Sequence, residues 1–177
     1  MTMQDIAAAM QRAHGVLQRR PQRGLHDDAP ATARWQKGVQ VVTRHANGTE
    51  VPTDIPAELG GHGEHVTPGW LFRAGLAACA ATSIAMAAAE AGIELEALEV
   101  RAGSRSDTRG ALGMNDVEGR RVFAGPGDVQ LHVRIRAHDA SPERLHALAE
   151  EGCRRSPVPN AVQAAVPLAL HVDVGTS

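Results

Sequence analysis

The two cysteines, Cys79 and Cys153, are the strongest candidate nucleophiles in this chain. A cysteine attacks as its thiolate, so a reactive one needs a nearby cation or hydrogen-bond donor. Cys79 falls in the middle of an apolar stretch, where a buried cysteine that only packs is an equally good interpretation. Cys153 precedes Arg154 and Arg155, and packing at a helix end is the simpler interpretation for it. The surrounding elements must therefore decide between chemistry and packing.

The stretch around Cys79 predicts one long helix over residues 67–91. Thr67 suits the N-cap, because its hydroxyl can accept a hydrogen bond from a first-turn N–H. Pro68 suits the first helical position, and Gly92 can end the helix in the left-handed conformation. Because the field of a helix dipole fades within one turn, Cys79 needs a cation or donor from another element.

The middle of this helix is nearly all apolar and consists mostly of Ala, Gly, Thr and Ser. A helix of that kind has to be buried on all sides. A chain of 177 residues with about six strands forms one sheet and leaves little else to cover the helix. We therefore expect a second copy to supply the cover, in an obligate homodimer.

The remaining elements alternate irregularly between helix and strand, which favours an α+β fold over a doubly wound sheet. Asn47-Gly48 predicts a tight hairpin turn, because both residues accept positive φ. Residues 1–30 read as an N-terminal helix and linker, and residues 31–177 as the main domain. Further helices are predicted over 3–19 and 141–154, and strands over 31–45 (broken near 37–38), 50–55, 97–105, 128–138 and 168–174.

Composition argues against several classes of function. The net charge is −2 and aromatic residues make up 2%, so we expect no nucleic-acid partner. Arg73 interrupts the long apolar stretch, and we expect no membrane span. The first residues lack the layout of a signal peptide, so we expect a cytoplasmic protein with reduced thiols.

A histidine-containing loop precedes the long helix. His62, Glu64 and His65 are a conceivable metal set, but the spacing is not HExxH, and a solvated glycine-rich loop is favoured. The chain has no nucleotide or phosphate loop, and we expect neither a metal nor a cofactor. A thiol hydrolase or transferase that pairs Cys79 with His65 stays open, although no motif supports it.

Three segments resemble the OsmC/Ohr superfamily, the osmotically inducible and organic hydroperoxide resistance proteins. Residues 56–79 resemble the family's glycine-pair loop and the helix that leads to its reactive cysteine. The strand pair on either side of 109–121 and the segment 151–162 follow in the family's order. The resemblance covers about residues 31–175. It implies an intertwined homodimer in which antiparallel sheets from both chains wrap the long cysteine-bearing helices.

The resemblance also implies roles for four residues. Cys79 matches the peroxidatic cysteine, Arg34 the activating arginine, and Glu58 the carboxylate that holds this arginine; Arg44 competes with Arg34. Cys153 is the candidate resolving cysteine. The implied activity is reduction of organic hydroperoxides, in which the thiolate becomes a sulfenic acid. A second cysteine condenses with it to a disulfide, which an external thiol or dithiol reductant then opens.

One departure from the family pattern concerns the second cysteine. Where the family has Cys-Pro, this chain has Ser156-Pro157. If the preceding helix runs through Ser156, Cys153 shares its face and can reach Cys79. If the helix ends earlier, as Pro157 favours, Cys153 is a bystander, and the protein is a one-cysteine member with an external thiol as resolver, or not a peroxidase at all. The departure keeps open a non-catalytic dimer that binds a small apolar or electrophilic ligand in its interface cavity.

Overall fold

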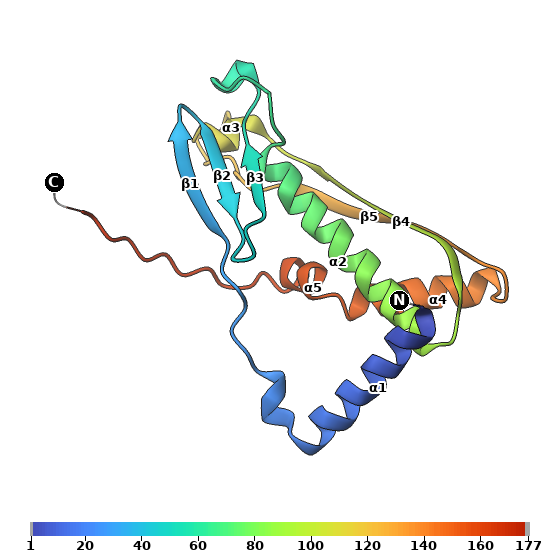
Figure 1. The fold of residues 1–177 in the computed structure, drawn as a ribbon. Helices are drawn as coiled ribbons and strands as arrows, with labels where there is room; N and C mark the ends of the chain where they lie inside the picture. The colour runs from blue at the N-terminus through green and yellow to red at the C-terminus, as the bar shows by residue number, and fades with distance from the viewer. Residues whose placement is uncertain (1, 176–177) are drawn as a thin grey trace.

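The computed structural model describes residues 2–175 and has an α+β architecture in which a long helix runs beside two separate antiparallel sheets (Figure 1). The elements are α1 (Met3–Arg19), η1 (Pro21–Gly24), β1 (Thr32–Lys37), β2 (Gln40–Arg44), β3 (Glu50–Thr53), η2 (Ala57–Leu59), α2 (Pro68–Glu90), β4 (Leu95–Arg105), α3 (Thr108–Ala111), β5 (Gly127–Ala137), α4 (Pro142–Arg154) and α5 (Pro157–Gln163).

Helix α2 begins and ends where the sequence predicts. The Thr67 hydroxyl accepts a hydrogen bond from the Trp70 N–H at 3.1 Å. At the other end, Gly92 adopts φ +67° and the Ile93 N–H donates to the Ala88 carbonyl at 2.9 Å. The turn at Gly92 leads the chain directly into β4, so helix and strand run back along one another.

The two sheets are formed by neighbours in sequence. Strands β1, β2 and β3 form a three-stranded sheet, and the turn between β2 and β3 has Gly48 at φ +91°. The antiparallel pairing of β2 with β3 confirms the predicted hairpin, but Asn47 does not take the predicted positive φ. Its side chain instead accepts a hydrogen bond from the Thr49 N–H at 2.9 Å. Strands β4 and β5 pair along their full length, from Leu95 opposite Ala137 to Arg105 opposite Gly127.

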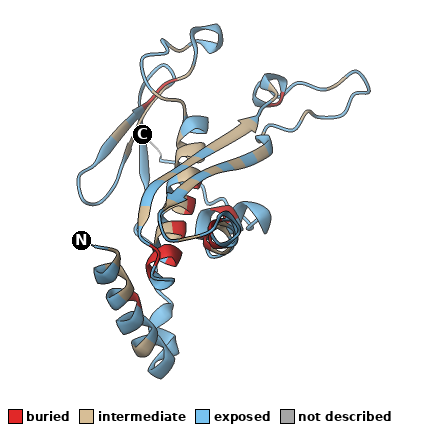
Figure 2. Cartoon of the chain, turned by 90° about the vertical axis from the view of Figure 1, so that its right-hand side faces the viewer, coloured by how far each residue is buried: buried red, intermediate tan, exposed pale blue. Residues whose placement is uncertain are grey.

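The core lies along one side of α2, which packs against β4, α4, α5 and α1. Figure 2 shows buried residues along α2 where it meets α4. Leu76, Ala80 and Ile84 are fully buried, whereas Trp70 and Met86 on the same helix stay well exposed. One copy of the chain therefore covers only part of a helix that is apolar all round.

The predicted strand over 168–174 is wrong for this structure. After α5 the chain runs on as an extended segment without ladder partners among the described residues (Figure 1). Its alternating apolar side chains are 71–96% exposed: Leu168, Leu170, Val172 and Val174. An alternating pattern predicts a strand with one apolar face, but the segment becomes a strand only when it can pair with the edge of another strand.

Helix α2 corrects the reason given for expecting no membrane span, namely that Arg73 interrupts the apolar stretch. Among the described residues it is the one helix long and apolar enough to cross a bilayer, judged by length and composition alone. The single arginine, Arg73, does not exclude it. The core helix of a water-soluble protein meets the same criterion, and α2 packs against four other elements here.

Candidate active site

The Cys79 sulfur meets two hydrogen-bond donors from the segment that joins α4 to α5. The Ser156 hydroxyl donates to Sγ at 3.2 Å, and the Val158 N–H donates at 3.5 Å. The Cys79 side chain is half-buried and Ser156 is completely buried. Another element thus supplies the hydrogen-bond donors that a mid-helix cysteine lacks.

Local sequence fixes the position of Ser156. Helix α4 ends at Arg154, and Ser156 is extended at φ −83° and ψ 116° as the N-cap residue of α5. Pro157 disfavours helical backbone at the residue before it and suits the first position of the next helix. The Asn160 side-chain amide donates to the carbonyls of Arg154 at 2.7 Å and of Ser156 at 2.8 Å. These two hydrogen bonds tie α5 to the end of α4 and hold the turn at Ser156 in place.

Helices α2 and α4 are held together one turn further along. A Cβ at Gly152 would lie 2.6 Å from the Ile84 Cα. The two helix backbones can approach this closely because residue 152 has no side chain. Arg155 forms an ion pair with Glu90 at the end of α2. The hydrogen bond from Arg155 holds the pKa of Glu90 below its usual value, against the opposing effect of partial burial. These contacts fix the distance between the helices that present Cys79 and Ser156.

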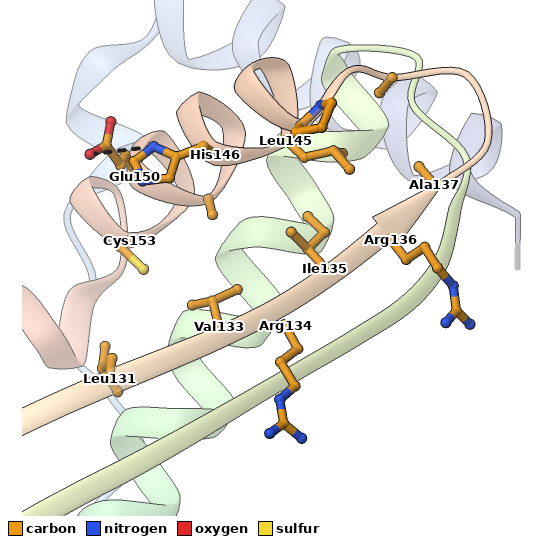
Figure 3. Close-up of a pocket in the computed structure, with 13 residues that line it drawn as sticks. Leu131, Val133, Arg134, Ile135, Arg136, Ala137, Leu145, His146, Glu150 and Cys153 are labelled. Atoms are coloured by element: carbon orange, nitrogen blue, oxygen red, sulfur yellow. Dashed lines mark ion pairs between the residues drawn. The ribbon is translucent and has the colours of Figure 1, made fainter.

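Cys153 lies on a different side of α4 from Gly152. It lines a groove of about 820 Å³ between α4 and β5, and Leu131, Val133 and Leu145 line the same groove (Figure 3). Burial raises the pKa of the Cys153 thiol. Within residues 2–175, the groups that hydrogen-bond the Cys79 sulfur are Ser156 and Val158, so the structure brings Ser156 rather than Cys153 to it.

Arg34 and Glu58 lie away from Cys79 in a single copy of the chain. Arg34 is exposed on β1 opposite Val42, and Glu58 is exposed in η2. Among the described residues, neither has a hydrogen bond or ion pair with the other or with Cys79. The competitor Arg44 pairs with Glu50 across the hairpin. The roles of Arg34 and Glu58 stay predictions.

Asp54 organises the loop before α2 and escaped the sequence-based prediction. Its buried carboxylate accepts hydrogen bonds from the N–H groups of Ile55 at 2.8 Å and His62 at 3.0 Å, and from Gln40 Nε2 at 3.4 Å. A Cβ at Gly61 would lie 1.9 Å from the Ile55 carbonyl oxygen. The sequence did contain a signal for this role: a single acidic residue lies between a strand and Pro56, and the glycine pair 60–61 follows.

These hydrogen bonds make the loop sensitive to acid. Burial raises the pKa of Asp54, but the hydrogen bonds outweigh it and the pKa lies below its usual value. A group with a lowered folded-state pKa stabilises the fold above its unfolded pKa, about 4, and this contribution is lost as pH falls further. We expect the thermal midpoint of the wild type to fall more than that of Asp54→Asn between about pH 6 and pH 3.

The matched control for this prediction is Asp28→Asn, because Asp28 is an exposed aspartate in the linker. Asp54→Asn should also have a lower midpoint than Asp28→Asn at neutral pH, since the amide accepts one hydrogen bond fewer. Equal pH dependence of both variants and the wild type would contradict a stabilising role for the Asp54 carboxylate.

The histidine loop is folded around this carboxylate. The His62 N–H contacts Asp54, and Gly63 donates to the Ile55 carbonyl at 3.2 Å. In the described part of the chain, no group of three or more His, Cys, Asp or Glu side chains is arranged to hold a metal ion.

The same fold and sequence pattern occur in known proteins. The chain matches the family model described as OsmC-like protein over residues 61–171, which is more than half of its length. An OsmC-like protein from Mycoplasma pneumoniae has a similar structure, with 18% sequence identity, coverage of 78% of this chain and 89% of that chain, and a TM-score of 0.64. A comparison with curated protein sequences gave no match.

Two organic hydroperoxide resistance proteins share the fold. The one from Elizabethkingia anophelis, with thiocyanate bound, is 24% identical, covers 78% of this chain and 90% of its own, and has a TM-score of 0.60. OhrB of Bacillus subtilis is 20% identical, with 77% and 91% coverage and a TM-score of 0.51. At these identities the structures establish the fold alone. Together with the family match, they show that the chain belongs to the OsmC-like protein family.

Proposed function

We propose that this protein is a thiol-dependent peroxidase that reduces organic hydroperoxides with Cys79 as the nucleophile. The observation that carries the proposal is the pair of donors on the Cys79 sulfur, from Ser156 and Val158. Structures of similar fold include organic hydroperoxide resistance proteins. The thiolate attacks the terminal oxygen of the hydroperoxide, an S–O bond forms, the O–O bond breaks, and the alkoxide that leaves takes a proton from solvent to become the alcohol. Cys79 is then a sulfenic acid.

The surroundings of the sulfur favour an apolar hydroperoxide. Val158 and Val162 lie one turn apart on α5, which packs against α2, and both are more than a third exposed. Most residues of α2 around Cys79 are alanines. A substrate with a hydrocarbon body would bury apolar surface against these side chains, whereas hydrogen peroxide would gain nothing from them.

The proposal includes a homodimer. Two apolar surfaces stay uncovered in one copy, namely the exposed parts of α2, which include Trp70 and Met86, and the alternating face of segment 168–174. A second copy would cover both, and an extended segment finds its hydrogen bonds when it joins a sheet edge. We propose that Arg34 and Glu58 complete the site at Cys79 only in this assembled dimer.

Light scattering of the protein as it elutes from a size-exclusion column is expected to give twice the chain mass of 18.6 kDa. Leu170→Asp should shift the protein toward the monomer, because it puts a charge on the apolar face of segment 168–174. His171→Asp is the matched control, since His171 alternates to the other face. Dimers of equal stability in both variants would exclude this segment from the interface.

The experiment that tests the peroxidase is turnover of cumene hydroperoxide by the wild type and by Cys79→Ser, with an added thiol reductant. The alternative function, a non-catalytic dimer that binds a small apolar or electrophilic ligand, is favoured by Ser156 at the family's second-cysteine position. It predicts saturable binding of such a ligand by the wild type without consumption of any hydroperoxide.

A further inference from the structure

We infer that oxidised Cys79 is restored by an external small thiol, and that Ser156 holds the place from which a resolving thiol of the chain would attack. The inference rests on the proposed peroxidase function and adds to it the source of the second sulfur. Three observations carry it: what touches the Cys79 sulfur, where Cys153 points, and what prevents the two cysteines from meeting.

The chain's own nearest side-chain donor to the Cys79 sulfur is a hydroxyl. Ser156 Oγ lies 3.2 Å from Sγ and is completely buried, so it occupies the approach to the sulfur from α4. A hydroxyl donates a hydrogen bond to a thiolate but forms no disulfide with it. The position that would hold a resolving sulfur therefore stabilises the nucleophile instead.

Cys153 faces away from this contact. Helix α4 ends at Arg154 and Ser156 is extended, so the two residues do not share a helix face. Gly152 packs directly against Ile84 of α2, and the next residue along a helix points about 100° away from it. Cys153 accordingly lines the groove toward β5 with Leu131 and Val133 (Figure 3).

The chemistry and packing of Cys153 both oppose its movement to Cys79. Burial raises its pKa, and a protonated thiol attacks sulfur slowly. To turn Cys153 toward α2, α4 would have to rotate about its axis. This rotation would break the Gly152–Ile84 contact and the ion pair between Arg155 and Glu90. The sulfur that regenerates Cys79 must then come from outside the chain.

The cycle balances with two equivalents of an external thiol. The first thiol attacks the sulfenic sulfur of Cys79, an S–S bond forms, the S–O bond breaks, and the oxygen leaves as water with the thiol proton. A second thiol attacks the mixed disulfide, releases Cys79 as a thiol and leaves as a symmetric disulfide. The hydroperoxide is reduced to its alcohol, and two external thiols are oxidised.

The experiment compares wild type, Cys153→Ser and Ser156→Cys. Each is treated with one equivalent of cumene hydroperoxide and then with one equivalent of β-mercaptoethanol, so that no second thiol is left to open a mixed disulfide, and its cysteine peptides are identified by mass. Wild type and Cys153→Ser should both give one added oxygen on Cys79 and then a mixed disulfide with β-mercaptoethanol. In the wild type, Cys153 should stay alkylatable throughout.

Ser156→Cys tests the geometry. The new sulfur takes the place of an oxygen 3.2 Å from Sγ, so a small rotation closes a disulfide. This variant is expected to form a disulfide between Cys79 and the introduced thiol, and to give no mixed disulfide. Circular dichroism identical to that of the wild type checks that it is folded.

Three results would overturn the inference. A Cys79–Cys153 disulfide in the wild type, within or between chains and absent from Cys153→Ser, would overturn it and leave the peroxidase standing. An oxidised Cys79 that forms no mixed disulfide would do the same. If the hydroperoxide leaves Cys79 unoxidised in both the wild type and Cys153→Ser, the proposed function is overturned, and the inference with it.

Discussion

Cys79→Ser is expected to lower the turnover of cumene hydroperoxide by about three orders of magnitude or more, as removal of a catalytic nucleophile does in other enzymes. The serine oxygen can keep the hydrogen bonds with Ser156 and Val158. It is not a thiolate, however, and it cannot become a sulfenic acid. The decisive measurement is loss of hydroperoxide over time with β-mercaptoethanol as the reductant.

Cys153→Ser is the matched control, because it removes the other thiol of the chain. This variant should turn over cumene hydroperoxide at the wild-type rate, since Cys153 lies in the groove toward β5. A Cys79→Ser protein that is folded and retains most of the activity would refute Cys79 as the nucleophile. A wild type that binds cumene hydroperoxide without consuming it would favour the non-catalytic dimer.

Gly152→Ala is expected to destabilise the fold and slow the oxidation of Cys79 together. The added Cβ would lie 2.6 Å from the Ile84 Cα and 2.9 Å from its N, and backbone atoms cannot turn aside. Overpacking of this kind costs about 1–3 kcal/mol of unfolding free energy. For a chain of this size, each kcal/mol lowers the thermal midpoint by roughly 2–4 °C.

The same substitution should act on the site through Ser156. If α4 moves off α2 to make room for the methyl group, Ser156 moves with it and its hydrogen bond to Cys79 lengthens from 3.2 Å. The rate at which one equivalent of cumene hydroperoxide oxidises Cys79 should therefore fall. Stopped-flow mixing measures this rate, and differential scanning calorimetry measures the midpoint.

Gly15→Ala is the control for Gly152→Ala, because both glycines lie inside helices. The nearest atom to a Cβ at Gly15 is Arg19 Nη1 at 3.5 Å, an ordinary contact. Alanine there should be neutral or stabilise by up to about 1 kcal/mol, since glycine is unfavourable in a helix interior. A Gly152→Ala protein with wild-type midpoint and rate would show that the Gly152–Ile84 contact does not position Ser156.

Local signals in the sequence predicted most of the elements. The Thr67 cap and Gly92 mark the ends of α2, Asn47-Gly48 marks the hairpin, and alternation marks β5. Each of these signals depends on residues within a few positions of one another, so a short stretch of sequence is enough to predict the local structure. The same holds for Ser156-Pro157, where proline ends α4 and opens α5.

Long-range contacts decided the site. The sequence identified Cys79 as a candidate nucleophile that would need a donor, but the donors come from residues 77 and 79 positions away. The side of α4 that faces α2 depends on how closely Gly152 approaches Ile84, and this packing turned Cys153 toward β5. Likewise, Asp54 became an anchor only when His62 and Gln40 folded onto it.

The sequence therefore determined that α2 is a capped, apolar helix with a cysteine at its centre, because helix ends and periodicity are local properties. Only the tertiary structure decided that Ser156 faces that cysteine and that residues 168–174 form no strand within one copy. A sequence pattern records which face of an element is apolar. The partner of that face depends on which distant surface packs against it.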